Sequence, residues 1–274
     1  MTLNVIGAGH VGRVLGRLLA SVAGVTVQDV LTRSMASARD AVAFIGAGTP
    51  VDSQAALRRS DITMLAVSDD QIGTACAALA VQGQLDGTVV FHCSGALASS
   101  ALQAAYDAGA AVASVHPIRS FADPAKVAAS FEGTFCGVEG DARAMALLTP
   151  LLLGIGARPV PIDAAAKTVY HAAAVFASNY LVTVLDAALR AYQAAGIPEA
   201  EARELAQPLA TEAMANVFRL GAAPALSGPI ARGDMATVVR QQQAVQQWDA
   251  PTGALYADMV APTARLAGRK RQQR

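Results

Sequence analysis

The segment Leu3–Gly12, LNVIGAGHVG, constrains the fold of this 274-residue chain more than any other part of the sequence. A short β-rich run leads into Gly-x-Gly-x-x-Gly, and a helical run follows. In such a loop Gly7 permits a tight turn, Gly9 lets the backbone approach a pyrophosphate, and Gly12 allows the helix to pack closely on the strand. Free N–H groups at the start of the helix would bind the phosphates. Six residues are expected at a dinucleotide cofactor: Gly7, Ala8, Gly9, His10, Val11 and Gly12.

Short β-rich runs alternate with helical runs, such as Val11–Ala23 and Asp141–Leu153, up to Pro161. This alternation predicts parallel strands joined by helical crossovers. Several of the runs are almost entirely apolar, as expected for strands that are covered by helices on both faces. Seven strands are predicted: Leu3–Ile6, Val25–Leu31, Ile62–Val67, Val89–His92, Ala113–His116, Phe135–Val138 and Arg158–Pro161.

The character of the sequence changes after Pro161, where the β-rich runs end. Segments that contain Gly and Pro separate the helical runs that follow. The sequence therefore predicts a Rossmann-type α/β domain with a parallel sheet over residues 1–162, followed by an all-α domain over residues 163–274. Helices of the second domain are expected at Ala164–Ala195, Pro198–Leu220, Gly233–Gln247 and Pro251–Ala267.

The predicted helix Ala164–Ala195 is longer than a single small domain normally covers. It is rich in alanine and apolar on several sides, which suggests that it is buried against a second subunit. The expected partner is therefore a second copy of the chain, in a homodimer formed through the C-terminal helices.

Charge and composition exclude several classes of protein. The 21 basic and 21 acidic residues cancel, so no field favours nucleic acid or an acidic membrane surface. No uninterrupted apolar run reaches the roughly 18 residues that span a bilayer; the best candidate, Ala172–Leu189, contains Ser178, Asn179 and Asp186. A β-rich run begins close to Met1, so no signal peptide is expected. The three cysteines match no metal spacing. These observations predict a soluble, cytoplasmic protein without a metal site.

The end of the second predicted strand indicates which dinucleotide is bound. Enzymes that use NAD usually carry an acidic residue there, which holds the ribose hydroxyls. Here Asp29 falls inside the strand, and Thr32, Arg33 and Ser34 follow it. A guanidinium and two hydroxyls can bind a 2′-phosphate, which a carboxylate would repel. We therefore expect NADP(H); the alternative is that Arg33 is an ordinary solvent-exposed loop residue.

Two later strand ends should also reach the cofactor, because ligands of such sheets bind outside the carboxyl ends of the strands. Val67, Ser68 and Asp69 follow one strand, and Ser94 and Gly95 follow the next. Asp69 and its neighbour Asp70 are equally consistent with the cap of a helix.

Histidines gather at the same predicted edge. His92 and His116 each end a strand, and His171 lies one helical turn after Lys167. A regular helix places Lys167, His171, Ala174 and Ser178 on one stripe, with Asn179 at its edge. Alanine between the polar groups leaves space, as a wall facing a substrate would. Structural histidines and a solvated stripe are the competing interpretations. A zinc site is not favoured, because no local ligand pair has a metal spacing. A nucleophile at Cys93 is not favoured either, because a cofactor that transfers hydride makes a covalent nucleophile unnecessary.

Four segments carry a resemblance to known families: HCSGAL (92–97), HPIRSF (116–121), YHAAAVFASNYL (170–181) and ALSGPIARGD (225–234). The N-terminal half resembles the NADP-binding domain shared by pyrroline-carboxylate reductases, ketopantoate reductases, prephenate dehydrogenases and β-hydroxyacid dehydrogenases. The whole chain is similar to a less characterised branch, in which a helical domain of unknown function follows a Rossmann-like domain. The resemblance implies a dimer formed by the helical domains and an active cleft between the domains.

The expected activity is hydride transfer between NADP(H) and a small carbonyl, imine or hydroxy acid. The expected catalytic residues are His171 or Lys167, which would move the proton, and His116, which would orient the substrate. A non-catalytic NADP-binding sensor is the alternative, since a fold does not fix a function. Substrate contacts are expected from His92, Ser94, His116, Ser178, Asn179 and Arg232.

Overall fold

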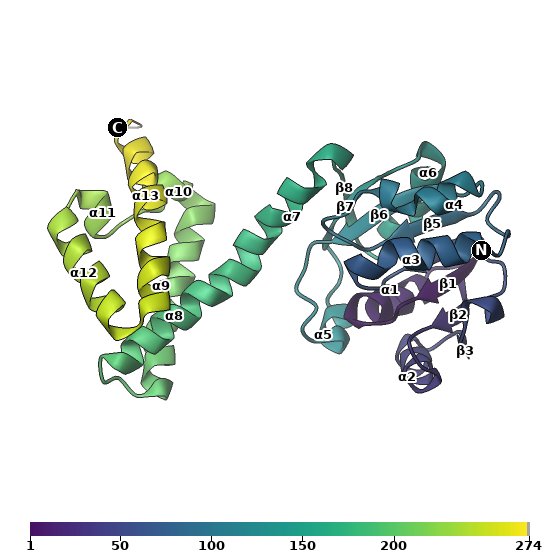
Figure 1. Ribbon diagram of the computed structural model, residues 1–274, viewed down its shortest axis with the longest axis horizontal. Coiled ribbons are helices and arrows are strands. Elements are labelled where there is room, and N and C mark those ends of the chain that lie inside the picture. Colours follow the sequence, from purple (N-terminus) through teal and green to yellow (C-terminus); the bar gives the residue numbers. More distant parts are fainter. Residues whose placement is uncertain (273–274) are drawn as a thin grey trace. The chain divides into compact units, whose positions relative to one another are not determined.

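A computed structural model describes residues 1–272 of the chain, which form two compact units (Figure 1). The first unit spans Met1–Ser178, and the second begins at Asn179. The division therefore lies sixteen residues beyond Ile162, within the helical run that follows Pro161.

The first unit is built on one eight-stranded sheet with the order β3-β2-β1-β4-β5-β6-β7-β8. All pairs are parallel except β6 and β7, which are antiparallel. Every residue of β4 and β5 is buried, in agreement with their apolar sequences. The strands are β1 (Thr2–Ile6), β2 (Thr26–Leu31), β3 (Thr49–Val51), β4 (Ile62–Leu65), β5 (Val89–His92), β6 (Ala111–Pro117), β7 (Phe135–Gly140) and β8 (Arg158–Pro161).

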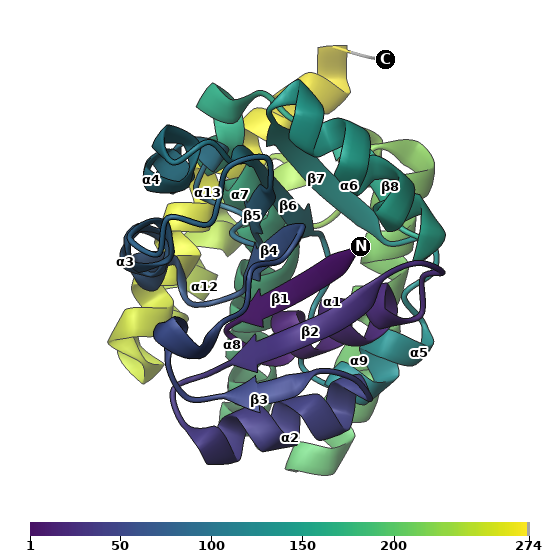
Figure 2. The same ribbon diagram turned by 90° about the vertical axis from the view of Figure 1, so that its right-hand side faces the viewer.

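Helices cover both faces of this sheet (Figure 2). One face packs against α1 (His10–Ala20), α2 (Met35–Ile45), α5 (Pro124–Ala129) and α6 (Ala142–Gly154). The other packs against α3 (Asp69–Ala80), the 3₁₀ turn η2 (Ser99–Leu102) and α4 (Gln103–Asp107). Another 3₁₀ turn, η1 (Gln54–Ala56), follows β3.

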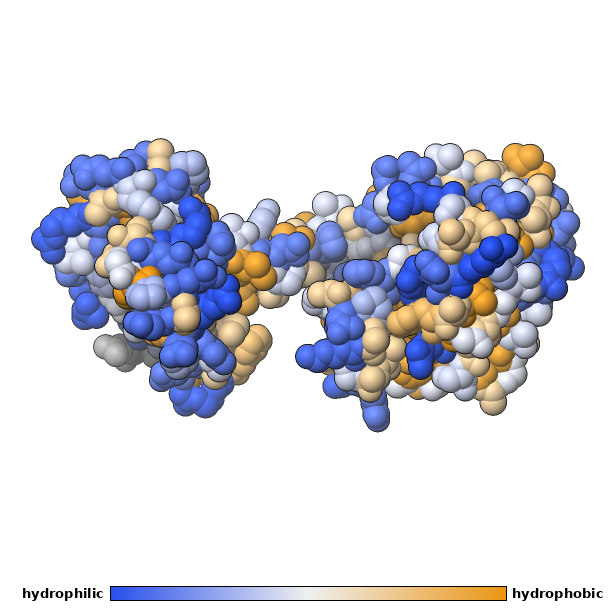
Figure 3. Space-filling model, turned by 90° about the horizontal axis from the view of Figure 1, so that it is seen from below, coloured by the Kyte–Doolittle hydropathy of each residue, from blue (hydrophilic) through white to orange (hydrophobic). Residues whose placement is uncertain are grey.

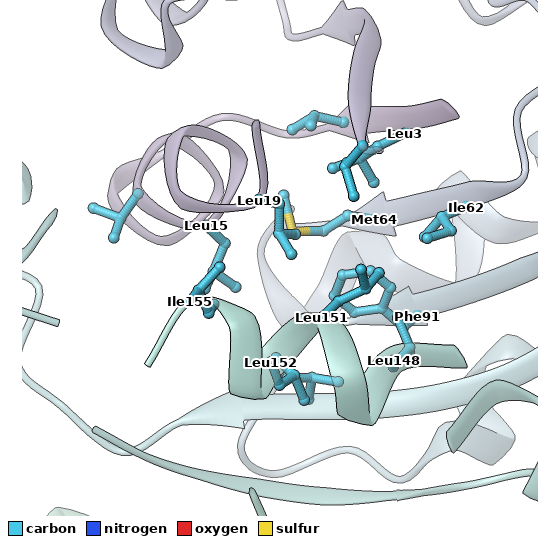
Figure 4. Packing of buried hydrophobic residues seen from close by; sticks show 14 of the residues in the cluster. Leu3, Leu15, Leu19, Ile62, Met64, Phe91, Leu148, Leu151, Leu152 and Ile155 are labelled. Carbon is cyan, nitrogen blue, oxygen red and sulfur yellow. The ribbon is translucent and has the colours of Figure 1, made fainter. Parts of the chain in front are cut away.

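Leucines dominate the packing on the first face. Figure 4 shows Leu15 and Leu19 of α1 near Met64 of β4, with Leu148 and Leu152 of α6 close by. Each of these side chains is at most 4% exposed. Burial of a leucine side chain contributes about 2 kcal/mol, so this layer fixes α1 and the glycine loop before it on the sheet.

The helical run after β8 is not uniform. The 3₁₀ turn η3 (Ala164–Ala166) and α7 (Lys167–Val175) lead into a π-helix, η4 (Phe176–Tyr180), and then α8 (Leu181–Ala194). The predicted stripe through Ser178 assumed a regular α-helix, and the π-helix makes that assumption wrong from Phe176 onward. Only Lys167, His171 and Ala174 keep the regular spacing.

The second unit is helical, as the sequence predicted. Its longer helices are α8, α9 (Glu199–Leu220), α12 (Met235–Trp248) and α13 (Ala250–Gln272), with the short α10 (Ala222–Ala225) and α11 (Pro229–Arg232) between them. Gly221, with a φ of +87°, separates α9 from α10, because the left-handed region is readily available only to glycine.

Hydrophobic side chains reach the surface of both units (Figure 3). Among the described residues, one helix, Ala164–Ala194, is by length and composition apolar enough to cross a membrane, with a mean hydropathy of 1.5. None of its most apolar window is buried within the chain. Core helices of soluble proteins pass the same test, so length and composition alone are weak evidence for a membrane span.

Candidate functional site

The glycine loop joins the end of β1 to the start of α1. Gly7 has a φ of +84°, and a Cβ there would lie 2.6 Å from the backbone nitrogen of Val67. A Cβ at Gly12 would lie 2.3 Å from the carbonyl oxygen of Gly7. A Cβ at Gly9, by contrast, would meet nothing within 4 Å. Packing therefore explains Gly7 and Gly12, whereas Gly9 borders open space at the N-terminus of α1.

The other residues predicted in this loop differ in exposure. Ala8 is buried, Val11 is half-buried and His10 is exposed. The Nδ1 atom of His10 forms a hydrogen bond of 2.6 Å with the carbonyl oxygen of Phe121. The histidine ring is thus tied to the segment before α5, beside the loop.

Asp29 lies within β2, and the polar residues Thr32, Arg33 and Ser34 form the turn that follows it. Asp29 is 1% exposed and forms an ion pair of 2.6 Å with Arg58, so this carboxylate is already bound within the domain. Thr32 Oγ1 donates to the carbonyl oxygen of Ser34 at 2.9 Å. Ser34 Oγ accepts from the backbone N–H of Ser37 and caps α2. Arg33 is exposed, and no hydrogen bond of its side chain occurs within residues 1–272.

The loops after β4 and β5 meet. Ser94 Oγ donates to Oδ2 of Asp69 at 2.9 Å and accepts from the backbone N–H groups of Ala96 and Leu97. Asp69 and Asp70 occupy the first turn of α3, where a carboxylate interacts favourably with the helix dipole. The structure therefore brings Asp69 and Ser94 together, whereas the alternative that Asp69 or Asp70 caps the helix is wrong, because Ser68 occupies the N-cap position. Ser68 is exposed directly before α3.

His92 is fully buried at the end of β5. Its Nδ1 accepts from the backbone N–H of Ser94 at 3.1 Å, and Nε2 lies 3.0 Å from the carbonyl oxygen of Ala98. Burial lowers the pKa of His92, so the ring is neutral and its proton lies on Nε2. Both nitrogens are used within the fold, and the ring shapes the Ser94 loop.

Lys167, the first residue of α7, is 1% exposed. Its Nζ donates to the carbonyl oxygen of Ser94 at 3.1 Å and to Oγ of Ser114. Burial lowers the pKa of Lys167, while the carboxylates of Glu139 and Asp69 act in the opposite direction. The lysine therefore places a buried positive charge beneath the loop that carries Gly95.

Sequence reasoning missed Ser114. Its hydroxyl binds Lys167 and also donates to the carbonyl oxygen of Ser94 at 3.3 Å. A serine in the otherwise apolar and fully buried part of β6 was the available signal, because buried polar groups are kept for a partner.

His116, Tyr170 and His171 form a second group beside Lys167. The rings of His116 and His171 are 5.5 Å apart in an edge-to-face arrangement. A Cβ at Gly95 would lie 2.3 Å from Nδ1 of His171 and 2.8 Å from Nε2 of His116, so only glycine leaves room for both rings. Burial, His171 and Lys167 together lower the pKa of His116 to about 4. The ring of His116 is consequently neutral near pH 7.

Nδ1 of His171 is buried and has no hydrogen-bond partner among the described residues. An unpaired buried nitrogen costs about 1–3 kcal/mol, and such atoms are rare in folded proteins. Sequence reasoning also missed Tyr170, whose hydroxyl oxygen lies 2.9 Å from Nδ1 of His116. The cluster thus combines a buried cation, two imidazoles and a phenol at the ends of β5 and β6.

Three predicted substrate contacts remain: Ser178, Asn179 and Arg232. Ser178 Oγ donates to the carbonyl oxygen of Ala174 in its own helix at 2.7 Å. Asn179 and the exposed Arg232 belong to the second unit, so their contact with a substrate stays a prediction.

Neither a metal cluster nor an activated thiol accompanies the site. Within residues 1–272, no group of three or more His, Cys, Asp or Glu side chains could hold a metal ion. Burial raises the pKa of all three cysteines, that of Cys136 to about 12 and that of Cys93 further still. These thiols are therefore protonated at neutral pH and are poor nucleophiles.

Two family models match consecutive parts of the chain, and the second match begins within the first unit, before β7. Residues 1–117 match the family model of a Rossmann-like domain, and residues 134–263 match that of a domain of unknown function, DUF2520. No curated protein sequence matches the chain significantly.

Solved structures resemble the whole chain. Protein TM1727 from Thermotoga maritima is 26% identical, with a TM-score of 0.73 over 98% of this chain and 99% of the other. An imine reductase from Myxococcus stipitatus, in complex with NADP⁺, is 19% identical, with a TM-score of 0.67 over 98% and 95%. A pyrroline-5-carboxylate reductase from Coxiella burnetii is 13% identical, with a TM-score of 0.58 over 96% and 98%. The chain thus shares the fold of these structures, and two consecutive segments of it match the Rossmann-like and DUF2520 models.

Proposed function

We propose that this protein is an NADP(H)-dependent oxidoreductase that acts on a small carbonyl, imine or hydroxy acid. The observation that carries the proposal is the conjunction of two features in one unit. Open space borders Gly9 at the N-terminus of α1, and a buried cluster with Lys167, His116 and His171 lies at the ends of neighbouring strands. The imine and pyrroline-carboxylate reductases with a similar fold support this class of activity.

The residues present fit an NADP(H) cofactor. The N–H groups at the start of α1 would bind the pyrophosphate beside Gly9. Arg33, with the hydroxyls of Thr32 and Ser34, would bind the 2′-phosphate, because Asp29 is committed to Arg58 and leaves no free carboxylate there. Val67, Ser68, Asp69, Ser94 and Gly95 would line the nicotinamide end. Bound NADP(H) would supply or accept the hydride.

The protein's own groups would control charge and protons. Lys167 would hold the Ser94–Gly95 segment through its bond to the Ser94 carbonyl, and its buried charge would stabilise negative charge on a substrate. His171 would accept the proton from a hydroxyl, or return it to the oxygen or nitrogen of the substrate. His116 would orient the substrate beside it.

Two substitutions test the cofactor assignment. Arg33→Ala should weaken NADPH binding at least tenfold, as expected for loss of a charge-assisted bond to phosphate, with little effect on NADH. Arg39→Ala is the matched control, because Arg39 is also an exposed arginine but lies within α2. It should change neither the NADPH nor the NADH affinity. Equal losses of NADPH and NADH in Arg33→Ala would contradict the proposed 2′-phosphate contact.

Turnover tests the catalytic assignment. His171→Asn should lower turnover of oxo and imino acids by about 100-fold or more, in line with the loss of an acid–base group, while NADPH affinity is kept. Unchanged turnover would remove His171 from the mechanism.

A non-catalytic NADP-binding sensor remains the second candidate. The observation in its favour is the near-complete burial of the Lys167 ammonium, which already binds two oxygen atoms. NADPH binding without turnover across a broad panel of small carbonyl, imine and hydroxy-acid compounds would favour this candidate.

The exposed apolar helices support a homodimer. Val182 of α8 is 67% exposed and Phe218 of α9 is 89% exposed, which a second copy of the chain would cover. Val182→Asp should convert a dimer to a monomer in analytical ultracentrifugation, whereas a change at the exposed Asp52 of the first unit should not. A wild-type chain that sediments as a monomer would refute this part of the proposal. A cytoplasmic location remains a prediction of the sequence.

A further inference from the structure

The two ring nitrogens of His116 have different surroundings. Nδ1 lies 2.9 Å from the hydroxyl oxygen of Tyr170, and the two rings meet edge to face at 5.6 Å. Nε2 has no hydrogen-bond partner among residues 1–272. The buried unpaired side-chain atoms of this part of the chain are Oε1 of Gln54 and Nδ1 of His171. Nε2 of His116 is therefore open to a ligand or to water.

The surroundings of Tyr170 decide which partner supplies the hydrogen. Burial raises the pKa of Tyr170 to about 12, so the phenolic oxygen keeps its hydrogen at neutral pH. A Cβ at Gly137 would lie 2.4 Å from that oxygen, so only glycine lets the Tyr170 hydroxyl lie this close to β7. The bond to Nδ1 of His116 is the only hydrogen bond of this hydroxyl within residues 1–272, so its O–H has no other acceptor there, and buried hydroxyls are rarely left unpaired.

Nδ1 of His116 is the acceptor in reach. Burial lowers the pKa of His116 most, His171 and the ammonium of Lys167 lower it further, and the carboxylate of Asp69 acts in the opposite direction. With a pKa of about 4, the ring of His116 is neutral near pH 7 and carries one hydrogen. If the O–H of Tyr170 points to Nδ1, that hydrogen lies on Nε2.

We propose that Tyr170 is a positioning residue that donates to Nδ1 of His116, holds its hydrogen on Nε2, and makes His116 a hydrogen-bond donor toward a substrate oxygen. This inference rests on the proposed function for the nature of the ligand, but its hydrogen-bond geometry does not. A fixed donor suits a carbonyl, hydroxyl or carboxylate oxygen. It does not suit the N–H of a protonated imine, which has no lone pair to offer. His116 therefore does not act as the general base, and the proton role falls to His171 or Lys167.

The protonation of the ring can be observed directly in the full chain. Long-range ¹H–¹⁵N spectra of the ¹⁵N-labelled protein at pH 7 distinguish protonated from unprotonated imidazole nitrogens, and His116→Asn assigns the signals. The expected wild-type result is an unprotonated Nδ1 and a protonated Nε2 on His116. A hydrogen on Nδ1 would overturn the proposal, and this outcome needs no variant of Tyr170.

Tyr170→Phe then tests the cause. Loss of the donor should allow both ring forms of His116 and raise its pKa above the value of about 4, because the bond to Nδ1 stabilises the neutral ring. Tyr256→Phe is the matched control, since its hydroxyl donates to Oε1 of Gln241 at 2.9 Å in the second unit and should leave the His116 signals unchanged. A single Nε2–H form that persists in Tyr170→Phe would refute the role of Tyr170.

Steady-state kinetics test whether His116 donates to a substrate oxygen. In Tyr170→Phe, kcat/KM for a carbonyl substrate should fall by about tenfold, the loss expected for one oriented hydrogen bond, while NADPH affinity is kept. An equal fall for a cyclic imine would contradict the preference for oxygen. Absence of NADPH binding by the wild-type protein would refute the proposed function and leave the spectroscopic result standing.

Discussion

Replacing His116 by glutamine should change how the stability of the first unit depends on pH. Glutamine keeps an amide oxygen that can accept from the hydroxyl of Tyr170, but it does not titrate. In the folded wild-type protein the pKa of His116 lies at about 4, against 6.5 for an unperturbed histidine. The neutral ring is therefore favoured by folding, because burial and the charges of Lys167 and His171 oppose its protonation.

The size of the effect follows from this difference in pKa. Because the folded-state pKa is the lower one, the contribution is fully present above pH 6.5 and is lost as the pH falls through 4. Each unit corresponds to 1.36 kcal/mol, so the wild-type protein should lose about 3 kcal/mol relative to His116→Gln between pH 7 and pH 4. The difference between the two proteins should change by about 1.4 kcal/mol per pH unit near pH 5.

Urea unfolding followed by far-ultraviolet circular dichroism at several pH values measures this difference. Trp248, the only tryptophan in the chain, lies in α12 of the second unit, so its fluorescence follows that unit separately and serves as an internal control. Parallel stability curves for the two proteins between pH 4 and 7 would show that His116 is not held neutral by its surroundings.

Three further substitutions probe other parts of the first unit. Gly9→Ala should leave the midpoint of thermal unfolding unchanged, since the added Cβ meets nothing within 4 Å. Calorimetry should nevertheless show about tenfold weaker NADPH binding, and an unaltered NADPH affinity would remove Gly9 from the cofactor site. Lys167→Met should change the free energy of unfolding by less than about 2 kcal/mol, because the bonds lost at Nζ are offset by relief of a buried charge. Turnover should nevertheless fall at least 100-fold, and a chain that melts far earlier in urea would argue for a structural lysine. Asp29→Asn should cost about 2 kcal/mol through the weakened pair with Arg58, and a changed ratio of NADPH to NADH affinity would show that Asp29 contacts the cofactor after all.

Much of the fold could be predicted because the strands of a covered sheet are apolar throughout. All seven predicted strands are present. The strand β3 was missed, since Thr49-Pro-Val51 is too short to form a recognisable apolar run. The antiparallel direction of β7 was also missed, because the apolar pattern of a strand is the same in both directions. The π-helix at Phe176–Tyr180 was missed for a related reason, as one extra residue per turn leaves no compositional mark.

The candidate site could be anticipated only in part. Lys167, His116 and His171 are unusual residues at positions that a parallel sheet brings together, so their proximity followed from topology. Tyr170 could not be recognised in the same way, because a tyrosine in a helix is common. Ser114 did carry a signal, as a polar residue in an apolar strand, but its partner could not be named from the sequence. Their roles depend on distances to Nζ of Lys167 and Nδ1 of His116, which arise only when the sheet and α7 pack together.

The unreactive thiols of Cys76, Cys93 and Cys136 make the chain suited to labelling. At neutral pH a maleimide or nitroxide reagent attacks a thiolate, and burial suppresses that form at all three native positions. A cysteine introduced on each unit, for example at exposed Val169 and exposed Val239, would carry the only reactive thiols without removal of any native one. A pair of fluorophores or spin labels at such positions would then report the distance between the two units in solution, with and without NADPH.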